Sequence, residues 1–302
     1  MGRVAAARPS DAGDRQVSRR ADRRRDGARV VAALALESVA IIGLGAIGGS
    51  VAKALARSGV RLRAYTASAA DAEAALRAGI DVANEIAGCV AAMQMVLIAV
   101  PVTAHAAIAD AVAAAAPDDA VLLHAASLQS ATAVGTERRV IGTHPLAGTH
   151  RAGFAAADTD LFAGCVVSIE ARASDDARTI AERLWRVVGA RRFEYRTAEE
   201  HDRLMTWVSH LPQLASTALA DAIATAGVES LALGPGGRDV TRLAASSFEM
   251  WGGILAAARP EAARAAAALE RSLSAIRSAL ESGDMEAVER IWTAARAWAD
   301  PG

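Results

Sequence analysis

Residues 38–50 read SVAIIGLGAIGGS, and this stretch decides the fold. Its first five residues form a short apolar run rich in β-branched side chains, which is typical of a buried parallel strand. Glycines follow with the spacing G-x-G-x-x-G, residues 51–56 continue as a predicted helix, and residues 60–66 form a second predicted strand. Strand, glycines, helix and strand within about 30 residues predict a domain that binds a dinucleotide.

Each glycine of this motif has its own physical role. Gly43 permits a tight turn, Gly45 lets the backbone approach a pyrophosphate, and Gly48 lets the helix pack closely against the strand. The backbone N–H groups at the start of the helix, at Ala46 and Ile47, then face the phosphates together with the positive end of the helix dipole. A glycine-rich turn in another α/β protein is the alternative, and the position of the motif between strand and helix disfavours it.

The end of the second predicted strand carries the residues that choose between NAD and NADP. An acidic residue about 20 positions after the glycines would bind the adenosine ribose and select NAD. Thr66 and Ser68 stand there instead, and their hydroxyl groups could bind a 2′-phosphate. The sequence slightly favours NADP or the use of both cofactors, although no arginine follows Thr66 at once. Pro101, at the end of the next predicted strand, is the remaining expected cofactor-binding residue.

Strands and helices alternate as far as about residue 196. Further strands are predicted at residues 95–101, 120–123, 139–142, 165–169 and 192–195, with a helix at 175–188. From about residue 197 the chain shows only helical patterns, at residues 201–224 and 260–298. The predicted fold is an α/β dinucleotide-binding domain of the Rossmann type, at residues 38–196, followed by an all-α domain at residues 197–302.

The charge pattern excludes some classes of protein. The chain of 302 residues has 33 basic and 34 acidic side chains, so its formal net charge of −1 excludes a wholly basic nucleic-acid binder. The first 36 residues hold nine arginines and four aspartates, which gives this stretch +5 and the remainder −6. We interpret residues 1–37 as a disordered basic tail, with a targeting segment and a nucleic-acid arm as the alternatives.

Cysteine content and hydropathy narrow the function further. Two cysteines, Cys89 and Cys165, are too few for a disulfide framework or a cysteine-rich metal site, and they favour a reducing, cytoplasmic location. The most apolar region, residues 90–116, is interrupted by polar residues and proline, so no membrane span is predicted. We therefore expect a cytoplasmic protein that acts on a small molecule, without a metal, a membrane or a nucleic-acid partner.

Three later segments carry polar residues that a plain scaffold would not need. His144 follows a predicted strand, where ligands bind in open α/β sheets, and its imidazole can accept a proton while a hydride leaves the same carbon. Residues 201–213 place His201-Asp202 and Ser209-His210, with Gln213, on one helix that Pro212 is expected to kink. Residues 236–243 lead to Trp251. Each segment alone is more often structural, but together they predict a catalytic site.

In these motifs and polar segments the chain resembles the prephenate/arogenate dehydrogenase family of tyrosine biosynthesis. The resemblance runs from Ser38 nearly to the C-terminus. The segments that carry it are residues 43–50, 144–148, 153–154, 161–162, 201–202, 209–212 and 241–242, with Trp251.

The resemblance implies an oxidative decarboxylation of a cyclohexadienol that carries a 4-hydroxyl group and a ring carboxylate. His144 would accept the hydroxyl proton while C4 passes a hydride to the nicotinamide of NAD(P)+. Loss of carbon dioxide would then form an aromatic ring, giving 4-hydroxyphenylpyruvate from prephenate or tyrosine from arogenate. Ser127 matches the family serine near the histidine and the nicotinamide.

Other residues match the substrate pocket of the family. Arg242 matches the arginine that binds a substrate carboxylate, a role that its planar guanidinium group suits. Asp239 matches a residue that reaches in from the partner subunit of a dimer. The other residues expected to bind substrate are His201, His210, Gln213, Thr149, His150 and Trp251.

Departures from the family pattern surround the expected substrate. His124 and Gln129 stand where the family often has an aspartate and a lysine on either side of the serine. His150 replaces a glutamate, Gln213 replaces a histidine and Gly253 replaces an aspartate. Prephenate, arogenate and another small acid therefore remain open as substrates.

The last helices leave two alternatives. The apolar stripe of residues 269–291 predicts either an internal helical core or a homodimer interface, with equal weight.

The leading prediction of function is an NAD(P)-dependent prephenate or arogenate dehydrogenase. A dehydrogenase of another small carboxylic acid in specialised metabolism and a non-catalytic nucleotide-binding relative are the alternatives, and the glycine motif with His144 and Arg242 favours catalysis.

Overall fold

Seven strands form one mixed sheet in the order β2-β1-β3-β4-β5-β6-β7. The structure is a computed structural model that describes residues 36–130, 140–148 and 151–300. Strands β1 to β5 are parallel, β6 runs antiparallel to β5, and β7 is parallel to β6. The strands are β1 (Ser38–Ile42), β2 (Arg61–Tyr65), β3 (Met95–Ile98), β4 (Val121–His124), β5 (Val140–Pro145), β6 (Val166–Glu170) and β7 (Arg192–Arg196).

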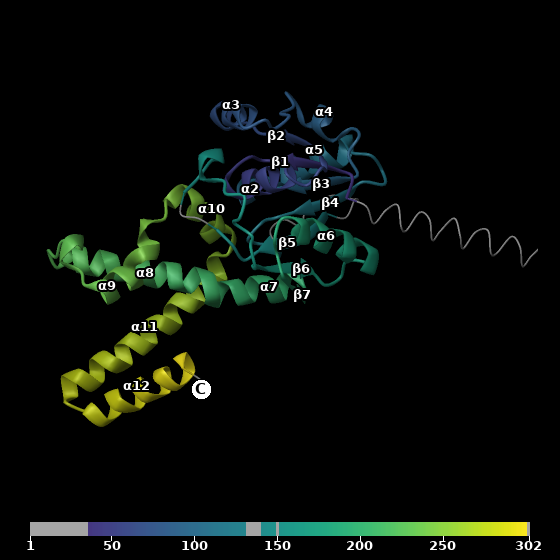
Figure 1. Cartoon of the computed structure of the whole chain (residues 1–302). Coiled ribbons are helices and arrows are strands. Elements are labelled where there is room, and N and C mark those ends of the chain that lie inside the picture. Colours follow the sequence, from purple (N-terminus) through teal and green to yellow (C-terminus); the bar gives the residue numbers. More distant parts are fainter. Residues whose placement is uncertain (1–35, 131–139, 149–150, 301–302) are drawn as a thin grey trace, which may run out of the picture.

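Helices cover both faces of the sheet, which confirms the predicted α/β layer (Figure 1). Val39 and Ile41 of β1 pack into one core, while Ala40 and Ile42 pack into the core on the opposite face. All five residues of β1 are buried, as a central parallel strand requires. The first core includes residues of α2 (Ala46–Leu55), α3 (Ala69–Arg77) and α6 (Asp175–Val187), and the second includes residues of α4 (Ile86–Val90) and α5 (Val102–Ala115).

Beyond β7 the described chain is helical, in agreement with the sequence prediction. A hairpin of two long helices, α11 and α12, extends away from the sheet in Figure 1. No described helix combines the length and the apolar character that crossing a membrane requires. The helices are α7 (Ala198–Met205), the π-helical turn η3 (Thr206–His210), α8 (Leu211–Thr225), α9 (Pro235–Thr241), α10 (Phe248–Ala257), α11 (Arg259–Ser282) and α12 (Met285–Ala299), with short 3₁₀ turns η4 (Ser230–Ala232) and η5 (Arg242–Ala245).

The structure corrects one expected element boundary and adds detail to two helical segments. Strand β5 runs to Pro145 rather than ending at Gly142, because its last three residues pair with β6, so His144 lies within a strand. Pro212, which lacks an N–H group, follows a wider π-helical turn that joins α7 to α8. The helical pattern of residues 260–298 is two helices, because Gly283, at φ 74°, ends α11 in the left-handed conformation.

The glycine motif adopts the geometry that its sequence predicts. Gly43 has φ 100°, and a Cβ atom there would collide with the backbone oxygen of Ala99. A Cβ atom at Gly48 would collide with the carbonyl oxygen of Gly43, so only glycine allows α2 to pack this closely. A Cβ atom at Gly45 would meet no atom within 4 Å, which leaves the start of α2 open.

A short segment after β5 crosses the outer side of α2 and α3. Lys53 of α2, the chain's single lysine, donates a hydrogen bond of 2.6 Å to the carbonyl oxygen of Ala157 and lies 4.7 Å from the ring centroid of Phe154. Asp71 of α3 accepts a hydrogen bond of 2.7 Å from the backbone N–H of Phe154. These contacts hold the segment against the helices that flank the glycine-rich turn.

Candidate active site

The predicted cofactor and catalytic residues converge on one edge of the sheet. Parallel strands present their carboxyl ends at the same edge, which is where open α/β sheets bind ligands. Gly43 follows β1, Thr66 follows β2, Pro101 precedes α5, Ser127 comes three residues after β4, and His144 is the penultimate residue of β5. The fold therefore brings together residues that are as many as 101 positions apart in the chain.

The start of α2 fits the phosphates of a dinucleotide. Gly45 is the N-cap residue, and no side chain caps the helix. The first N–H groups of a helix, here those of Ala46 and Ile47, have no acceptor within the helix. Together with the open space at Gly45, these donors form a cradle that a phosphate can enter.

The turn after β2 presents two hydroxyl groups. Thr66 Oγ1 accepts a hydrogen bond of 3.3 Å from the backbone N–H of Ser68, and Ser68 Oγ accepts one of 3.2 Å from Asp71 at the start of α3. Both hydroxyl groups keep their own proton, so each can still donate to a ribose hydroxyl or a phosphate. The guanidinium group of Arg63 on β2 pairs with the carboxylate of Asp81 at 3.1 Å, so it is already engaged and is not assigned to phosphate binding.

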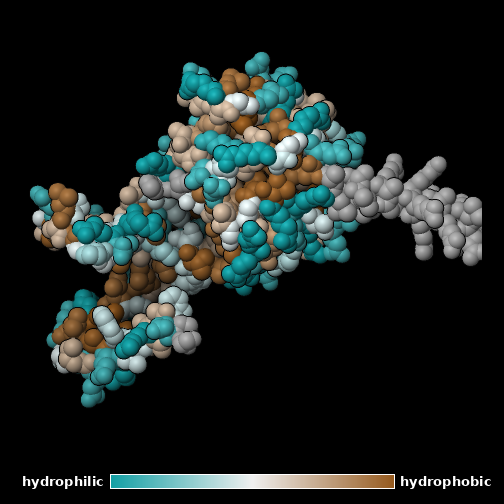
Figure 2. Space-filling view, in the orientation of Figure 1, coloured by the Kyte–Doolittle hydropathy of each residue, from teal (hydrophilic) through white to brown (hydrophobic). Residues whose placement is uncertain are grey.

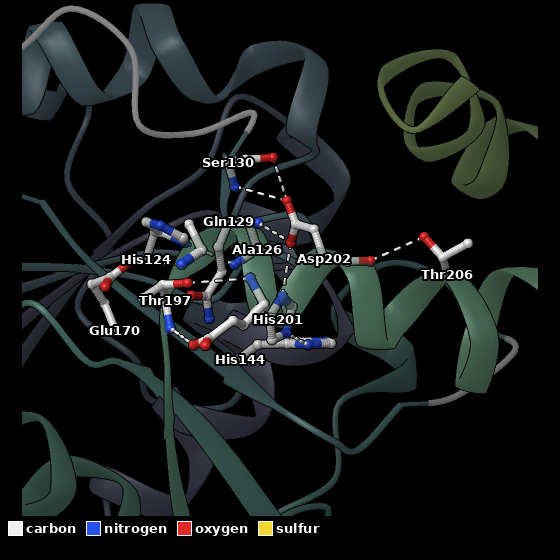
Figure 3. A network of polar contacts seen from close by, with 12 residues as sticks. His124, Ala126, Gln129, Ser130, His144, Glu170, Thr197, His201, Asp202 and Thr206 are labelled. Atoms are coloured by element: carbon white, nitrogen blue, oxygen red, sulfur yellow. Dashed lines mark hydrogen bonds and ion pairs between the residues drawn. The ribbon is translucent and has the colours of Figure 1, made fainter. Parts of the chain in front are cut away.

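His144 is the first member of a hydrogen-bonded chain, drawn in Figure 3. Its Nδ1 lies 3.0 Å from Nε2 of His201 on α7. The Nδ1 atom of His201 lies 2.8 Å from the Oδ1 atom of Asp202. The carboxylate of Asp202 also accepts hydrogen bonds from the backbone N–H groups of Gln129 and Ser130, each 2.8 Å long, and from the Ser130 hydroxyl group. These hydrogen bonds thus join the end of β5 to the loop after β4 through α7.

Burial sets the protonation state of His144. Burial is the largest of the effects that together lower the pKa of His144 to about 3; His201 acts in the same direction and Asp202 in the opposite direction. His144 is therefore neutral at neutral pH and can accept a proton. Part of its side chain remains accessible, and its Nε2 atom has no partner among the described residues.

A second pair of imidazoles lies behind the site. His124, the last residue of β4, and His105 of α5 pack edge to face with ring centroids 4.8 Å apart. Burial lowers the pKa of His124 to about 3 and that of His105 to about 4. Neither ring nitrogen of His105 has a hydrogen-bond partner in the described part of the chain.

These imidazoles make stability depend on pH. In the unfolded chain each titrates near its usual pKa of about 6.5. Because their folded pKa values are lower, the unfolded state binds more protons below pH 6.5, and the free energy of unfolding falls as pH falls. Each contributes up to about 1.4 kcal/mol per pH unit until its folded pKa is reached. We expect the free energy of unfolding, measured by urea denaturation, to fall from pH 7 to pH 5. In His105→Leu we expect this free energy to fall less over the same range. An unchanged slope in His105→Leu would contradict this assignment.

The helical domain contributes two further polar side chains, His210 and Trp251. His210 of η3 packs edge to face with Trp251 of α10, with ring centroids 6.0 Å apart. Within the described residues, Nδ1 of His210 and Nε1 of Trp251 are buried without a hydrogen-bond partner, so both can bind a polar ligand or water. Burial lowers the pKa of His210, which favours its neutral form.

Gln213 and Arg242 are linked through the backbone. The Nε2 atom of Gln213 on α8 donates a hydrogen bond of 2.9 Å to the carbonyl oxygen of Leu243, next to Arg242. This bond fixes the start of η5, where Arg242 is exposed and forms no hydrogen bond or ion pair with the other described residues. The Arg242 guanidinium group is thus available to a carboxylate.

The remaining predicted site residues are placed as follows. Ser127 is half-buried, and its hydroxyl group forms no hydrogen bond within the described ranges. Asp239 is exposed on α9 and has no ionic partner in the part of the chain that is described. Thr149 and His150 lie outside the described residues. Among those residues, no three or more histidine, cysteine or acidic side chains are arranged to hold a metal ion.

Sequence reasoning noticed Asp202 only as part of a motif and overlooked His105. Asp202 directly follows His201, and an acidic residue beside a histidine is the signal that marks it. The signal for His105 is its place four residues after Pro101, in the first turns of the helix that follows a buried strand.

A phosphate cradle and a neutral imidazole at one sheet edge suit a reaction in which a base removes a proton while a dinucleotide takes up two electrons. The fold and the site thus define a Rossmann-type oxidoreductase that uses a nicotinamide dinucleotide. The family profile "Prephenate dehydrogenase, nucleotide-binding domain" matches residues 51–194, and "Prephenate dehydrogenase, dimerization domain" matches residues 197–293. The chain belongs to the prephenate dehydrogenase family.

Individual relatives agree with this assignment. The chain is 31% identical to the cyclohexadienyl dehydrogenase of Zymomonas mobilis, over 72% of this chain and 79% of that protein. It is 27% identical to the prephenate dehydrogenase of Bacillus subtilis, over 87% of this chain and 76% of that one. The solved prephenate dehydrogenase of A. aeolicus, in complex with hydroxyphenyl propionate and NAD+, superposes with a TM-score of 0.76 and 26% identity, covering 88% and 99% of the two chains.

Proposed function

We propose that this protein is a prephenate or arogenate dehydrogenase, which catalyses the oxidative decarboxylation of a cyclohexadienol in tyrosine biosynthesis. The observation that carries the proposal is the neutral, hydrogen-bonded His144 at the same sheet edge as the glycine-rich phosphate cradle. The names of the relatives support this substrate class.

Each residue of the site has a proposed part in the reaction. His144 accepts the proton of the substrate hydroxyl group at its Nε2 atom, which breaks the O–H bond and forms an N–H bond. Arg242 binds a substrate carboxylate, and His210 and Trp251 line the pocket. Ser127 lies near the nicotinamide. The bound nicotinamide supplies the acceptor for the hydride that leaves C4 of the substrate.

A turnover assay tests this proposal. The purified protein is mixed with prephenate or arogenate and with NAD+ or NADP+, and the absorbance of the reduced nicotinamide is followed. We expect turnover with at least one pair and formation of 4-hydroxyphenylpyruvate or tyrosine. Turnover with neither substrate would contradict the proposal. Turnover with another small acid would then favour the specialised dehydrogenase, and cofactor binding without turnover would favour the non-catalytic relative.

We further propose that the cofactor is NADP or that both cofactors are used. The support is the turn after β2, where Thr66 and Ser68 offer hydroxyl protons in place of a carboxylate. Introducing a carboxylate by Thr66→Asp is expected to raise KM for NADP+ about tenfold or more through repulsion of the 2′-phosphate, with a smaller change for NAD+. Equal changes for both cofactors would contradict a role of Thr66 in this choice.

The helical domain, residues 197–302, is proposed to bind substrate and to form a homodimer, with residues 38–196 as the cofactor domain. The last strand ends at Arg196 and α7 begins at Ala198, which supports this boundary. No described residue of α12 is buried, and Trp292 is 74% exposed. Figure 2 shows apolar surface gathered between the arm of α8 and α9 and the hairpin of α11 and α12, where a second copy can bury it. Light scattering after size exclusion tests for the dimer.

A cytoplasmic location is also part of the proposal. The two cysteines are free, and burial raises the pKa of Cys89 to about 12, so this thiol stays protonated. Free thiols are typical of proteins in reducing compartments.

A further inference from the structure

We propose that Asp202, acting through His201, is a positioning residue that holds His144 in the tautomer whose Nε2 atom accepts the substrate proton. This inference deepens the proposed function and rests on it. It assigns His201 a role different from substrate binding, because both of its ring nitrogens already have protein partners.

The charge of Asp202 is the starting point of the argument. Burial alone would raise the pKa of Asp202, but hydrogen bonds from His201, from the Ser130 hydroxyl group and from the backbone N–H groups of Gln129 and Ser130 outweigh it and lower the pKa. The side chain is therefore a carboxylate, which accepts hydrogen bonds and donates none.

With a neutral His201, this carboxylate determines the direction of the two following hydrogen bonds. Because Asp202 only accepts, the Nδ1 atom of His201 carries the proton, and the Nε2 atom of a neutral His201 is an acceptor. His144 must in turn donate from Nδ1 to this acceptor, 3.0 Å away. A neutral His144 with its proton on Nδ1 has its lone pair on Nε2. That atom is the one without a partner among the described residues.

The hydrogen-bonded residues His201 and Asp202 also stabilise the product of the proton transfer. Once Nε2 has gained the substrate proton, His144 is an imidazolium ion in a buried setting that disfavours charge. Its Nδ1–H group remains bonded to His201, whose other nitrogen is bonded to a carboxylate. A negative charge two hydrogen bonds away lowers the energy of the imidazolium ion, which is the role of the aspartate in a catalytic triad.

His201 is the better position for the test, because Asp202 also binds two backbone N–H groups of the loop that carries Ser127. His201→Leu removes the acceptor for His144 and leaves the contacts of Asp202 with the loop in place. His201→Gln places an amide oxygen where it can accept from His144 Nδ1. Thr206→Val is the matched control, since the Thr206 hydroxyl group donates to the backbone carbonyl oxygen of Asp202 and not to its carboxylate.

The tautomer is read by ¹⁵N NMR of histidine-labelled protein at pH 7.5, with the His144 signals identified by their absence in His144→Asn. We expect a protonated Nδ1 and an unprotonated Nε2 at His144 in the wild type, in Thr206→Val and in His201→Gln. In His201→Leu and Asp202→Ala we expect a mixture of both tautomers. The kcat of these two variants is expected to fall about 10²-fold or more with KM and cofactor affinity nearly unchanged, and His201→Gln is expected to recover most of it.

Two results would overturn the inference. One is a wild-type His144 protonated at Nε2. The other is a His201→Leu variant with an unchanged tautomer and kcat. The NMR result does not depend on the substrate, so a wild type with the expected tautomer and no turnover would count against the proposed function and leave the positioning role supported.

Discussion

Replacing His144 by asparagine is expected to lower kcat by about 10²–10⁴-fold, the usual contribution of a general base. Asparagine has no group that can take up a proton at neutral pH, and no other residue of β5 (Val140–Pro145) has a side chain that can replace the lone pair of Nε2. The affinity for the cofactor should stay the same, because the phosphate cradle is formed by the start of α2. Steady-state kinetics and a cofactor titration measure the two quantities.

His105→Asn is the matched control for this experiment. It makes the same change at a buried imidazole that contacts His124 and lies outside the hydrogen-bonded chain of His144. We expect a less stable protein with kcat within a few-fold of the wild type. A His144→Asn variant with near-normal turnover would show that the proton leaves by another group.

Arg242→Ala is expected to raise KM for the acid substrate about 10- to 100-fold. Charge-assisted hydrogen bonds contribute about 1.5–3 kcal/mol, and about 1.4 kcal/mol corresponds to a factor of ten. Arg242 is exposed and forms no hydrogen bond or ion pair with the other described residues, so its removal should leave the fold unchanged. KM for the cofactor should stay within a few-fold, which the same kinetic experiment measures.

Two neighbouring variants sharpen the result. Arg242→Lys keeps the charge but loses the planar pair of donors, so an intermediate KM is expected. Arg238→Ala removes a nearby arginine whose guanidinium group already binds the carbonyl oxygen of Leu233, and it should leave KM nearly unchanged. An equal rise of both KM values in Arg242→Ala would indicate that Arg242 is structural.

The fold could be predicted well where local sequence and burial agree. Residues 38–42 form a strand in the sequence analysis and in the structure, because four apolar residues, 39–42, before a glycine turn can be buried on both faces of a sheet. The extension of β5 to Pro145 could not be predicted, because it depends on pairing with β6, about 20 residues further along the chain. The π-helical turn before Pro212 also depends on packing that sequence periodicity does not describe.

The sequence predicts where His144 lies in the fold but not which residues it contacts. His144 was marked by its place near the end of a strand, and the structure puts it at the predicted sheet edge. Its link to His201 joins residues 57 positions apart, and the direction of that hydrogen bond depends on a carboxylate whose partners come from a third segment. Helical periodicity places His201 on a helix face and does not show which strand that face meets.

The reversal of strand direction beside His144 has an evolutionary consequence. The turns after β1 and β2 lie where we propose that the cofactor binds, whereas β5 completes its pairing with β6, and the connection between β5 and β6 spans residues 146–165. Changes in that connection and in the C-terminal helices can therefore alter the choice of substrate without altering the turns after β1 and β2. Such a division allows related proteins to keep the same cofactor while the acid that they oxidise changes.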